Sequence, residues 1–340
     1  PYVAVDWEEF EQHKAALHVH TTMSDGGGAP SAAIDRYVEF GYTIVAITDH
    51  DTQGPYNDLN HPNRARTTWP WEAFGRVPET LGVLAVEGNE ISHLAHHNSY
   101  FCDYGNPEIA SEAESLEAIA AKGGVAIMNH PGRYTSGEDA IVRDVDWYVQ
   151  MFRTYPHLVG IEVYNQIDRF PGDRATWDAL LTELIDERPV WGLSNDDMHN
   201  MDSQLGCNGD VMLVPELTEA WIWRALVDGT FFFFHSSLPN DAAVPTIQAI
   251  CASEADGTIA IQASDHDRIE WISEGRVVCT GDEICLDDVA NLGGYVRAMV
   301  YATAGDAVIG TQPFRVVRIE DAKRRGGSNA GGALTPAGGK

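Results

Sequence analysis

Short apolar runs alternate with amphipathic stretches from the N-terminus to about residue 238. The apolar runs predict buried strands, because continuous apolar segments of this length are typical of strands covered on both faces. The stretches between them place apolar residues three or four positions apart, which predicts helices. This alternation predicts an α/β fold built on a parallel sheet or barrel. The expected strands are one that ends at His20 and those at 42–51, 81–92, 98–104, 124–130, 158–165, 189–199 and 231–237.

Helix signals lie between these runs. Ser31 is a suitable N-cap for a helix with Ile34 and Val38 on one face. A helix over 111–124 has an acidic first turn and a glycine stop, as the helix dipole favours. A further helix is expected at about 216–228, before the last strand of this part of the chain.

The connection from Thr52 to about Pro78 is too long for a plain link between two elements. Its many Pro, Asn, Arg and Trp residues predict an insertion that covers a site. The side chains expected to shape specificity there are Arg64, Arg66, Trp69 and Trp71.

The pattern changes at about Pro239, where short β-rich runs follow one another between Gly and Asp turns. These runs predict a small all-β, immunoglobulin-like sandwich. We therefore expect a first domain at 1–238 and a β-sandwich domain at 239–320. Residues 321–340 are rich in Gly and Ala without an apolar period, which predicts a disordered or artificially added tail.

The net charge of the chain limits the kinds of molecule that it is expected to bind. The chain has 340 residues, enough for a barrel plus a small domain, and a formal net charge of −29. Such an acidic surface repels phosphate backbones and disfavours extended nucleic acid, although a salt-rich habitat or simple solubility explains it equally well. No apolar run approaches the length of a membrane helix, so we expect a soluble protein that binds no membrane. Because the chain begins at Pro1, it is either exported with its leader removed or cytoplasmic.

The five cysteines show no CxxC spacing, which excludes a zinc ribbon or a thioredoxin-type motif. Cys279 and Cys285 flank a plausible hairpin turn. They form either a disulfide in an oxidising compartment or two free thiols, and the sequence leaves both open.

Histidines and carboxylates gather at the ends of the expected strands. His18 and His20 lie two residues apart, and therefore point to the same side of a strand. One such pair is weak support for a metal site, but five other strand ends supply further ligands. The full set is His18, His20, Asp25, His50, Glu90, His96 or His97, His130, Asp197 and His199. These are too many for one four-coordinate zinc ion and predict two or three divalent ions, Zn, Mn or Fe, bridged by Glu90.

Glu87 is the alternative to Glu90 in the same strand. The two residues are three positions apart, so their carboxylates face opposite sides of the strand and only one can line the site.

Five motifs, LHVHTTMSDG, AITDHDT, GNEIS, MNHPGR and SNDDMH, resemble those of the PHP (polymerase and histidinol phosphatase) superfamily of metal-dependent phosphoesterases. The resemblance extends over about residues 15–237. It implies a distorted seven-stranded (β/α) TIM-like barrel with a trinuclear metal centre, and GNEIS favours Glu90 over Glu87.

The resemblance also implies a division of the ligands. The first ion would be held by His18, His20, Glu90 and Asp197, and the second by Glu90, His130 and one of His96 and His97. Asp25, His50 and His199 would hold the third. HHNSYF is similar to the family pattern with His96 as ligand, and Asp25 stands where some relatives have histidine.

The implied chemistry is attack on phosphorus by a hydroxide that the ions generate near neutral pH. No G-x-S-x-G elbow or Cys-His pair offers a protein nucleophile. The candidate catalytic residues are Asp197, His199 and Arg133. Arg133 could grip a phosphate with its planar fork or form a surface ion pair. Asp49 could accept a hydrogen bond from a metal-bound imidazole or simply cap a loop.

We therefore expect a metal-dependent phosphomonoesterase or phosphodiesterase that acts on small phosphorylated substrates. Two alternatives stay open. The barrel could be non-catalytic, with a β-sandwich that binds a partner or glycan, or the metals could serve amide or ester hydrolysis. Against the latter, no lysine stands at a strand end where a carbamylated bridge could form. The sequence does not indicate the oligomeric state.

Overall fold

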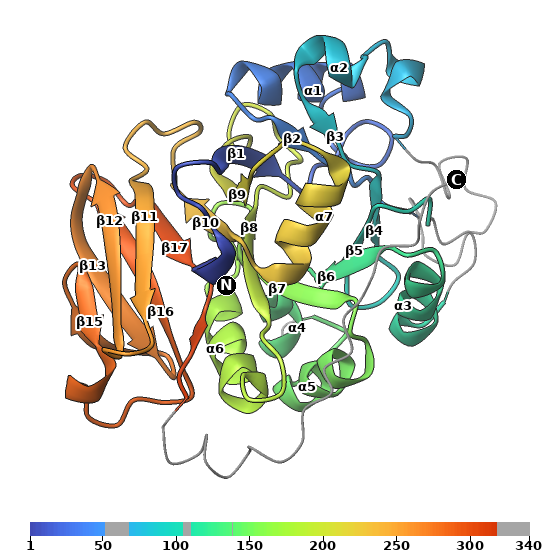
Figure 1. Cartoon of the computed structure of the whole chain (residues 1–340). Coiled ribbons are helices and arrows are strands. Elements are labelled where there is room, and N and C mark those ends of the chain that lie inside the picture. The colour runs from blue at the N-terminus through green and yellow to red at the C-terminus, as the bar shows by residue number, and fades with distance from the viewer. Residues whose placement is uncertain (52–67, 105–109, 138, 318–340) are drawn as a thin grey trace.

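The computed structural model describes residues 1–51, 68–104, 110–137 and 139–317. Helices and three β-sheets make up a mixed α/β structure, with the strands after residue 245 gathered on one side (Figure 1). Within the described residues no helix is long and apolar enough to cross a membrane. Arg64, Arg66 and the predicted tail at 321–340 lie outside the described residues.

The strands of the first part form two groups. β1 (Glu11–Ala16), β2 (Ile44–Val45) and β3 (Leu84–Ala85) pair in parallel. A five-stranded sheet contains β4 (Gly88–Ile91), β5 (His97–Tyr100), β6 (Val125–Met128), β7 (Leu158–Asn165) and β8 (Trp191–Asn195), in that order. Only two residues separate β3 from β4, so one chain segment joins the two groups.

Two isolated bridges bring the carboxyl ends of these strands together. Val19, beyond β1, pairs in parallel with Met198, beyond β8. His50, beyond β2, pairs in parallel with Glu90 in β4. Pairing therefore runs from β1 to β2, reaches β4 through the His50–Glu90 bridge, and returns from β8 to the β1 segment through the Val19–Met198 bridge. As a result, residues that follow several strands meet at one edge.

β5 departs from the expected parallel arrangement. It pairs antiparallel with both β4 and β6, whereas β6, β7 and β8 are parallel. Because its direction is reversed, the amino end of β5 lies at the edge where its neighbours have their carboxyl ends. The histidines that precede β5 are thereby brought to the same edge as Glu90.

The helices are α1 (Pro30–Glu39), α2 (Pro78–Leu81), α3 (Glu112–Ala121), α4 (Pro131–Thr135), α5 (Val145–Thr154), α6 (Gly172–Leu184) and α7 (Glu219–Asp228), with short 3-10 helices at Tyr2–Ala4, Trp71–Phe74 and Leu286–Asp288. α1 begins one residue before the expected cap: Ala29 is the N-cap, and Pro30 takes the first helical position, where its fixed φ fits and its missing N–H costs nothing. α3 begins with a capping box between Ser111 and Glu114.

The strands after residue 245 form two antiparallel layers. One sheet contains β11 (Thr246–Ser253), β12 (Thr258–Ser264) and β15 (Glu283–Cys285). The other contains β13 (His266–Ser273), β14 (Arg276–Thr280), β16 (Tyr295–Ala302), β17 (Val308–Thr311) and β18 (Phe314–Arg315). Cys279 and Cys285 are free thiols that lie in different sheets.

The second of these sheets continues into the first part of the chain. β17 pairs antiparallel with β10 (Phe231–His235), which pairs with β9 (Asn208–Val214), and β9 pairs with β1. Hydrogen bonding therefore crosses the expected boundary between 238 and 239, and the division into two domains there stays a prediction.

A buried ion pair also joins the two parts. Arg297 of β16 donates from Nε and Nη2 to the two carboxylate oxygens of Asp178 of α6, at 2.9 and 2.8 Å. The hydroxyl of Tyr295 donates to the same carboxylate at 2.6 Å. Arg297 is 3% and Asp178 8% exposed, so both charges are withdrawn from water and depend on each other.

Candidate metal centre

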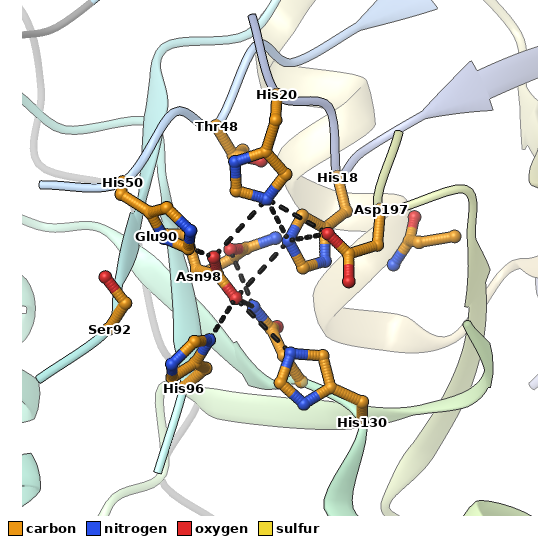
Figure 2. A network of polar contacts seen from close by, with 12 residues as sticks. His18, His20, Thr48, His50, Glu90, Ser92, His96, Asn98, His130 and Asp197 are labelled. Atoms are coloured by element: carbon orange, nitrogen blue, oxygen red, sulfur yellow. Dashed lines mark hydrogen bonds and ion pairs between the residues drawn. The ribbon is translucent and has the colours of Figure 1, made fainter. Parts of the chain in front are cut away.

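All nine predicted ligand positions supply side chains to three overlapping clusters or to their immediate contacts. At the position that the sequence left open between two histidines, His96 is the one that faces Glu90. Figure 2 shows Glu90 between the imidazoles of His18, His20, His50, His96 and His130, with Asp197 beside His18 and His20. The clusters in which one atom of each residue lies within 4.8 Å of the others are His18, His20 and Glu90; His50, Glu90 and His96; and His20, Asp25, His50 and His199.

The innermost cluster lies where the segments of β1 and β8 meet. His18 Nε2 lies 3.4 Å from both Glu90 Oε1 and Asp197 Oδ1, and His20 Nε2 lies 3.0 Å from Asp197 Oδ1. The two Nε2 atoms are 3.1 Å apart. Both histidines are fully buried, and their spacing of two residues directs both rings to one point.

Glu90 links this cluster with a second one. Its Oε1 lies 2.9 Å from His96 Nδ1 and 3.5 Å from His130 Nε2, while its Oε2 lies 2.7 Å from His50 Nδ1. A carboxylate with both oxygens facing imidazoles on opposite sides is suited to bridge two ions. The central position predicted for Glu90 therefore agrees with the geometry of its contacts.

The outer cluster gathers around Asp25. Its Oδ1 lies 3.2 Å from His199 Nε2 and 3.5 Å from His50 Nε2. Since His50 directs Nδ1 to Glu90 and Nε2 to Asp25, one imidazole faces both the second cluster and the outer one. Asp25 and His199 are more exposed than the inner residues, at 46% and 27% of their side chains, so this cluster is the most solvent-accessible part of the centre.

Local backbone geometry supports these positions. A Cβ on Gly26 would lie 2.4 Å from the backbone of His20, so only glycine permits the tight turn that returns Asp25 to His20. His130 and Asp197 have positive φ angles of 29° and 43°, which non-glycine residues rarely adopt. Such strain is typical of functional sites.

The donor set suits divalent cations, because imidazole nitrogens and carboxylate oxygens bind Zn, Mn and Fe. Within the described part of the chain, the buried atoms Glu90 Oε2 and Asp197 Oδ1 approach imidazole nitrogens without making a hydrogen bond. Buried polar atoms are normally paired, so carboxylate oxygens and imidazole nitrogens that converge without hydrogen bonds fit the coordination of a cation. These residues fit a metal centre, while the number and kind of ions belong to the proposal below.

The pKa values of the candidate ligands show how closely the charges are packed. Burial would raise the pKa of Glu90 and Asp197, but the histidines around them hold both values well below the usual range. Against burial, Glu90 and Asp25 raise the pKa of His50 to about 10. Burial lowers the pKa of His96 to about 4 despite the nearby Glu90. A bound cation would take the place of the proton on His50.

The structure distinguishes the two tandem histidines. His96 faces Glu90, whereas His97 Nε2 lies 2.7 Å from the Ser115 hydroxyl and its Nδ1 lies 3.1 Å from the Ala95 carbonyl. Because His97 is the first residue of β5, its side chain points to the opposite face from that of His96.

We therefore expect His96→Gln and His97→Gln to have different effects. The first removes a donor to Glu90's cluster and should lower metal content, because a cation bound there would lose an imidazole ligand. The second should leave metal content unchanged and cost about 1–3 kcal/mol of stability, because the buried Ser115 hydroxyl loses one of its two hydrogen bonds and keeps only the one it donates to the Glu112 carbonyl. Elemental analysis and thermal unfolding of both variants measure this, and equal metal loss in the two would contradict the assignment.

Glu162 supports two candidate ligands, and the sequence motifs did not predict it. It lies fully buried in β7, and its Oε1 accepts a hydrogen bond from His18 Nδ1 at 2.7 Å. Its Oε2 accepts one from the backbone N–H of His130 at 2.8 Å. A carboxylate behind an imidazole fixes the ring so that the opposite nitrogen faces the ion. The available signal was a single charged residue inside the otherwise apolar run LVGIEVYN.

Asp49 is linked through its hydrogen bonds to His20 and not to the adjacent His50. Its carboxylate accepts hydrogen bonds from the Thr21 N–H and the Ser24 hydroxyl, both at 2.6 Å, and from the Thr68 hydroxyl. Ser24 Oγ in turn lies 3.2 Å from His20 Nδ1. Asp49 therefore ties down the loop after β1, and it reaches a candidate ligand through Ser24. The choice between a direct orienting role and a loop cap stays a prediction.

Replacing Ser24 by alanine tests this indirect link. Without the hydroxyl, the ring of His20 loses a polar contact on the side opposite the cluster. Metal affinity is expected to fall about 10- to 100-fold, as is typical for such outer partners. Competitive titration against a chromophoric chelator measures the change. Ser136→Ala, at an exposed hydroxyl after α4, is the matched control and should leave affinity unchanged.

Glu87 and Arg133 are the other residues for which the sequence left two interpretations. Glu87 is partly exposed, and burial and the carboxylate of Asp103 raise its pKa. Its offset of three residues from Glu90 directs its side chain to the opposite face of the chain segment. Arg133 donates from Nε to Asp139 at 2.8 Å and is 38% exposed. The surface ion pair thus exists, and a role of Arg133 at a bound phosphate stays a prediction.

Comparison with known structures supports the fold. The chain is similar to a two-domain protein from Bacteroides vulgatus that contains a predicted PHP-like metal-dependent phosphoesterase, with 17% identity, a TM-score of 0.57, and 92% of this chain and 96% of that chain covered. The resemblance to PHP-like proteins expected from the motifs is therefore confirmed at the level of the fold, including the presence of a second domain in that neighbour.

Two other solved structures overlap less. One is a candidate metal-dependent phosphoesterase from Bifidobacterium adolescentis, with 16% identity, a TM-score of 0.40, and 55% of this chain and 88% of that chain covered. The other is an amidohydrolase from Chromobacterium violaceum with bound sulfate and no metal, with 16% identity, a TM-score of 0.39, and 67% and 99% covered. No protein-family model and no curated protein matches the sequence.

Proposed function

We propose that this protein is a metal-dependent hydrolase of small phosphate esters. The observation that carries the proposal is the convergence of imidazoles and carboxylates from different strand ends on Glu90 (Figure 2). The return of strand pairing from β8 to β1 supports a distorted, seven-stranded TIM-like barrel around this centre. The two antiparallel layers after residue 245 support an immunoglobulin-like sandwich as the second domain.

Three overlapping ligand clusters support a centre of three divalent ions. Bound there, the ions would supply a water of lowered pKa as nucleophile and neutralise charge on the phosphoryl oxygens. The chain's own residues set up this chemistry. Glu90 would bridge, His18 and His20 would hold the innermost ion, and Glu162 keeps the ring of His18 in a fixed orientation.

The exposed outer cluster favours entry of substrate beside Asp25 and His199. Asp197 lies between the inner and outer clusters, since its Oδ1 is 3.4 Å from both His18 Nε2 and His199 Nδ1. This position supports a role of Asp197 and His199 next to the reacting phosphate. The formal charge of −29 continues to disfavour extended nucleic acid as a partner.

The test is release of inorganic phosphate from a panel of phosphomonoesters and phosphodiesters by protein loaded with Mn²⁺, Zn²⁺ or Fe²⁺. Amide and carboxylate ester substrates are assayed in parallel. Phosphate release that chelation removes and metal restores is the expected result. Turnover of amides alone would assign the centre to the other hydrolase class, and turnover that survives chelation would refute the metal mechanism.

A further inference from the structure

The loop between β7 and α6 lies against the outer part of the metal centre. Gln166 and Ile167 in this loop have positive φ angles of 45° and 68°, which turn the chain sharply after β7. The Gln166 amide nitrogen lies 3.4 Å from the Asp197 carbonyl oxygen and 3.3 Å from His199 Nδ1. On its other side, the Gln166 carbonyl oxygen accepts a hydrogen bond from Arg169 at 2.6 Å. The Gln166 side chain therefore connects the guanidinium of Arg169 with His199, a candidate metal ligand.

The same loop also touches the opposite side of the centre. The ring of Phe170 packs against the ring of His130, with centroids 5.7 Å apart, and the Arg169 guanidinium lies 5.1 Å from the Phe170 centroid. Arg169 is thus held between contacts to Gln166 and Phe170. Its exposed position at the rim leaves its remaining N–H donors open to solvent.

Arg169 is unusual among the basic residues of this acidic chain. Every other described Lys or Arg except Lys14 and Arg188 forms an ion pair with a carboxylate. Lys14 instead donates to the Phe40 carbonyl, and Arg188 donates to the backbone carbonyls that surround it. Arg169 has no carboxylate partner among the described residues.

The adjacent Asp168 would be the simplest partner for Arg169, but it is engaged elsewhere. Its two carboxylate oxygens accept from Nη1 and Nη2 of Arg174 at 2.8 and 3.0 Å. With a net charge of −29, the chain has many carboxylates, yet none in the described ranges forms an ion pair with this guanidinium. A positive charge kept unpaired at the rim of a site for an anion is suited to bind an anionic group of the ligand.

We propose that Arg169 binds a second anionic group of the substrate. The favoured substrates are then phosphate esters that carry another phosphate or a carboxylate a few bonds from the reacting phosphorus. The inference rests on the proposed function, because the first phosphate must occupy the metal centre. Gln166 separates the guanidinium from His199, so Arg169 reaches the part of the substrate beyond the reacting phosphoryl group.

Binding of non-hydrolysable phosphonates to the metal-loaded protein tests this inference without relying on turnover. The probes are propylphosphonate, 3-phosphonopropionate and propane-1,3-diphosphonate, which have the same spacer and differ in the second group. In calorimetric titrations, the dissociation constant of at least one doubly anionic probe should be about tenfold lower than that of propylphosphonate. One additional charge-assisted hydrogen-bonded pair provides a gain of this size. The stronger of the two shows whether a carboxylate or a phosphate is preferred.

The Arg169→Gln variant should lose this preference and keep the wild-type affinity for propylphosphonate. Arg224→Gln is the matched control, because Arg224 is an exposed arginine of α7 that is paired with Asp228, and it should keep the preference. Equal binding of all three probes to the wild type, or a preference that persists in Arg169→Gln, would overturn the inference while the proposed function stands. If no phosphonate binds the metal-loaded wild type, the proposed function fails, and the inference fails with it.

Discussion

Replacing Glu90 by glutamine is expected to abolish hydrolysis, with kcat/KM reduced by about 10³-fold or more, and to lower the metal content. Both oxygens of Glu90 face imidazoles, and two of the three ligand clusters contain this residue. The amide has one oxygen acceptor and no charge, so it cannot bridge two cations. Loss of bound ions removes several kcal/mol of transition-state stabilisation, which corresponds to this reduction in rate.

Glu87→Gln is the matched control for this variant. It makes the same chemical change three residues earlier in the chain, at a side chain that faces away from the histidines. Steady-state assays and elemental analysis should show wild-type activity and metal content. If Glu87→Gln loses activity while Glu90→Gln retains it, the assignment of the bridging carboxylate is wrong.

Replacing Arg297 by methionine is expected to destabilise the protein by about 3–5 kcal/mol. The substitution removes the partner of the buried Asp178 carboxylate, and an uncompensated buried charge costs roughly this amount. The loss should appear as a lower denaturation midpoint in urea. Because β16 lies in the β-rich part after residue 245 and α6 lies before it, the change in stability also reports the contribution of this contact between the two parts.

Arg268→Met is the control for the buried pair. Arg268 lies on the neighbouring strand β13, is 48% exposed and pairs with Glu270, so its loss should cost less than about 1 kcal/mol. The double variant Arg297→Met with Asp178→Leu should recover much of the loss, because a well-packed apolar pair can replace a buried ion pair. Equal midpoints for Arg297→Met and Arg268→Met would contradict this account.

The candidate ligands could be predicted from the sequence because their geometry is local. The spacing of His18 and His20 fixes their common face, and the odd offset between Glu87 and Glu90 allows only one of them to line the site. The positions of His50 and Asp197 beyond apolar runs indicate strand ends. Each of these signals depends on a few consecutive residues, so one sequence suffices to recognise it.

Other features depend on contacts between residues distant in sequence. The similarity of HHNSYF to the family pattern favoured His96, but the contact of His96 with Glu90 depends on the reversed direction of β5, which a short apolar run does not reveal. Glu162 meets His18 across 144 positions of chain. The pairing of β10 with β17, which continues one sheet past residue 238, likewise depends on long-range hydrogen bonding. Local patterns carry no information on such partners.

The most direct test of the central claim is anomalous diffraction from crystals grown with Mn²⁺ and measured with X-rays that give a strong manganese signal. The account predicts anomalous peaks within bonding distance of Glu90, with a further peak beside Asp25 and His199. Crystals of an active, Mn²⁺-loaded protein that show no peak at Glu90 would contradict it.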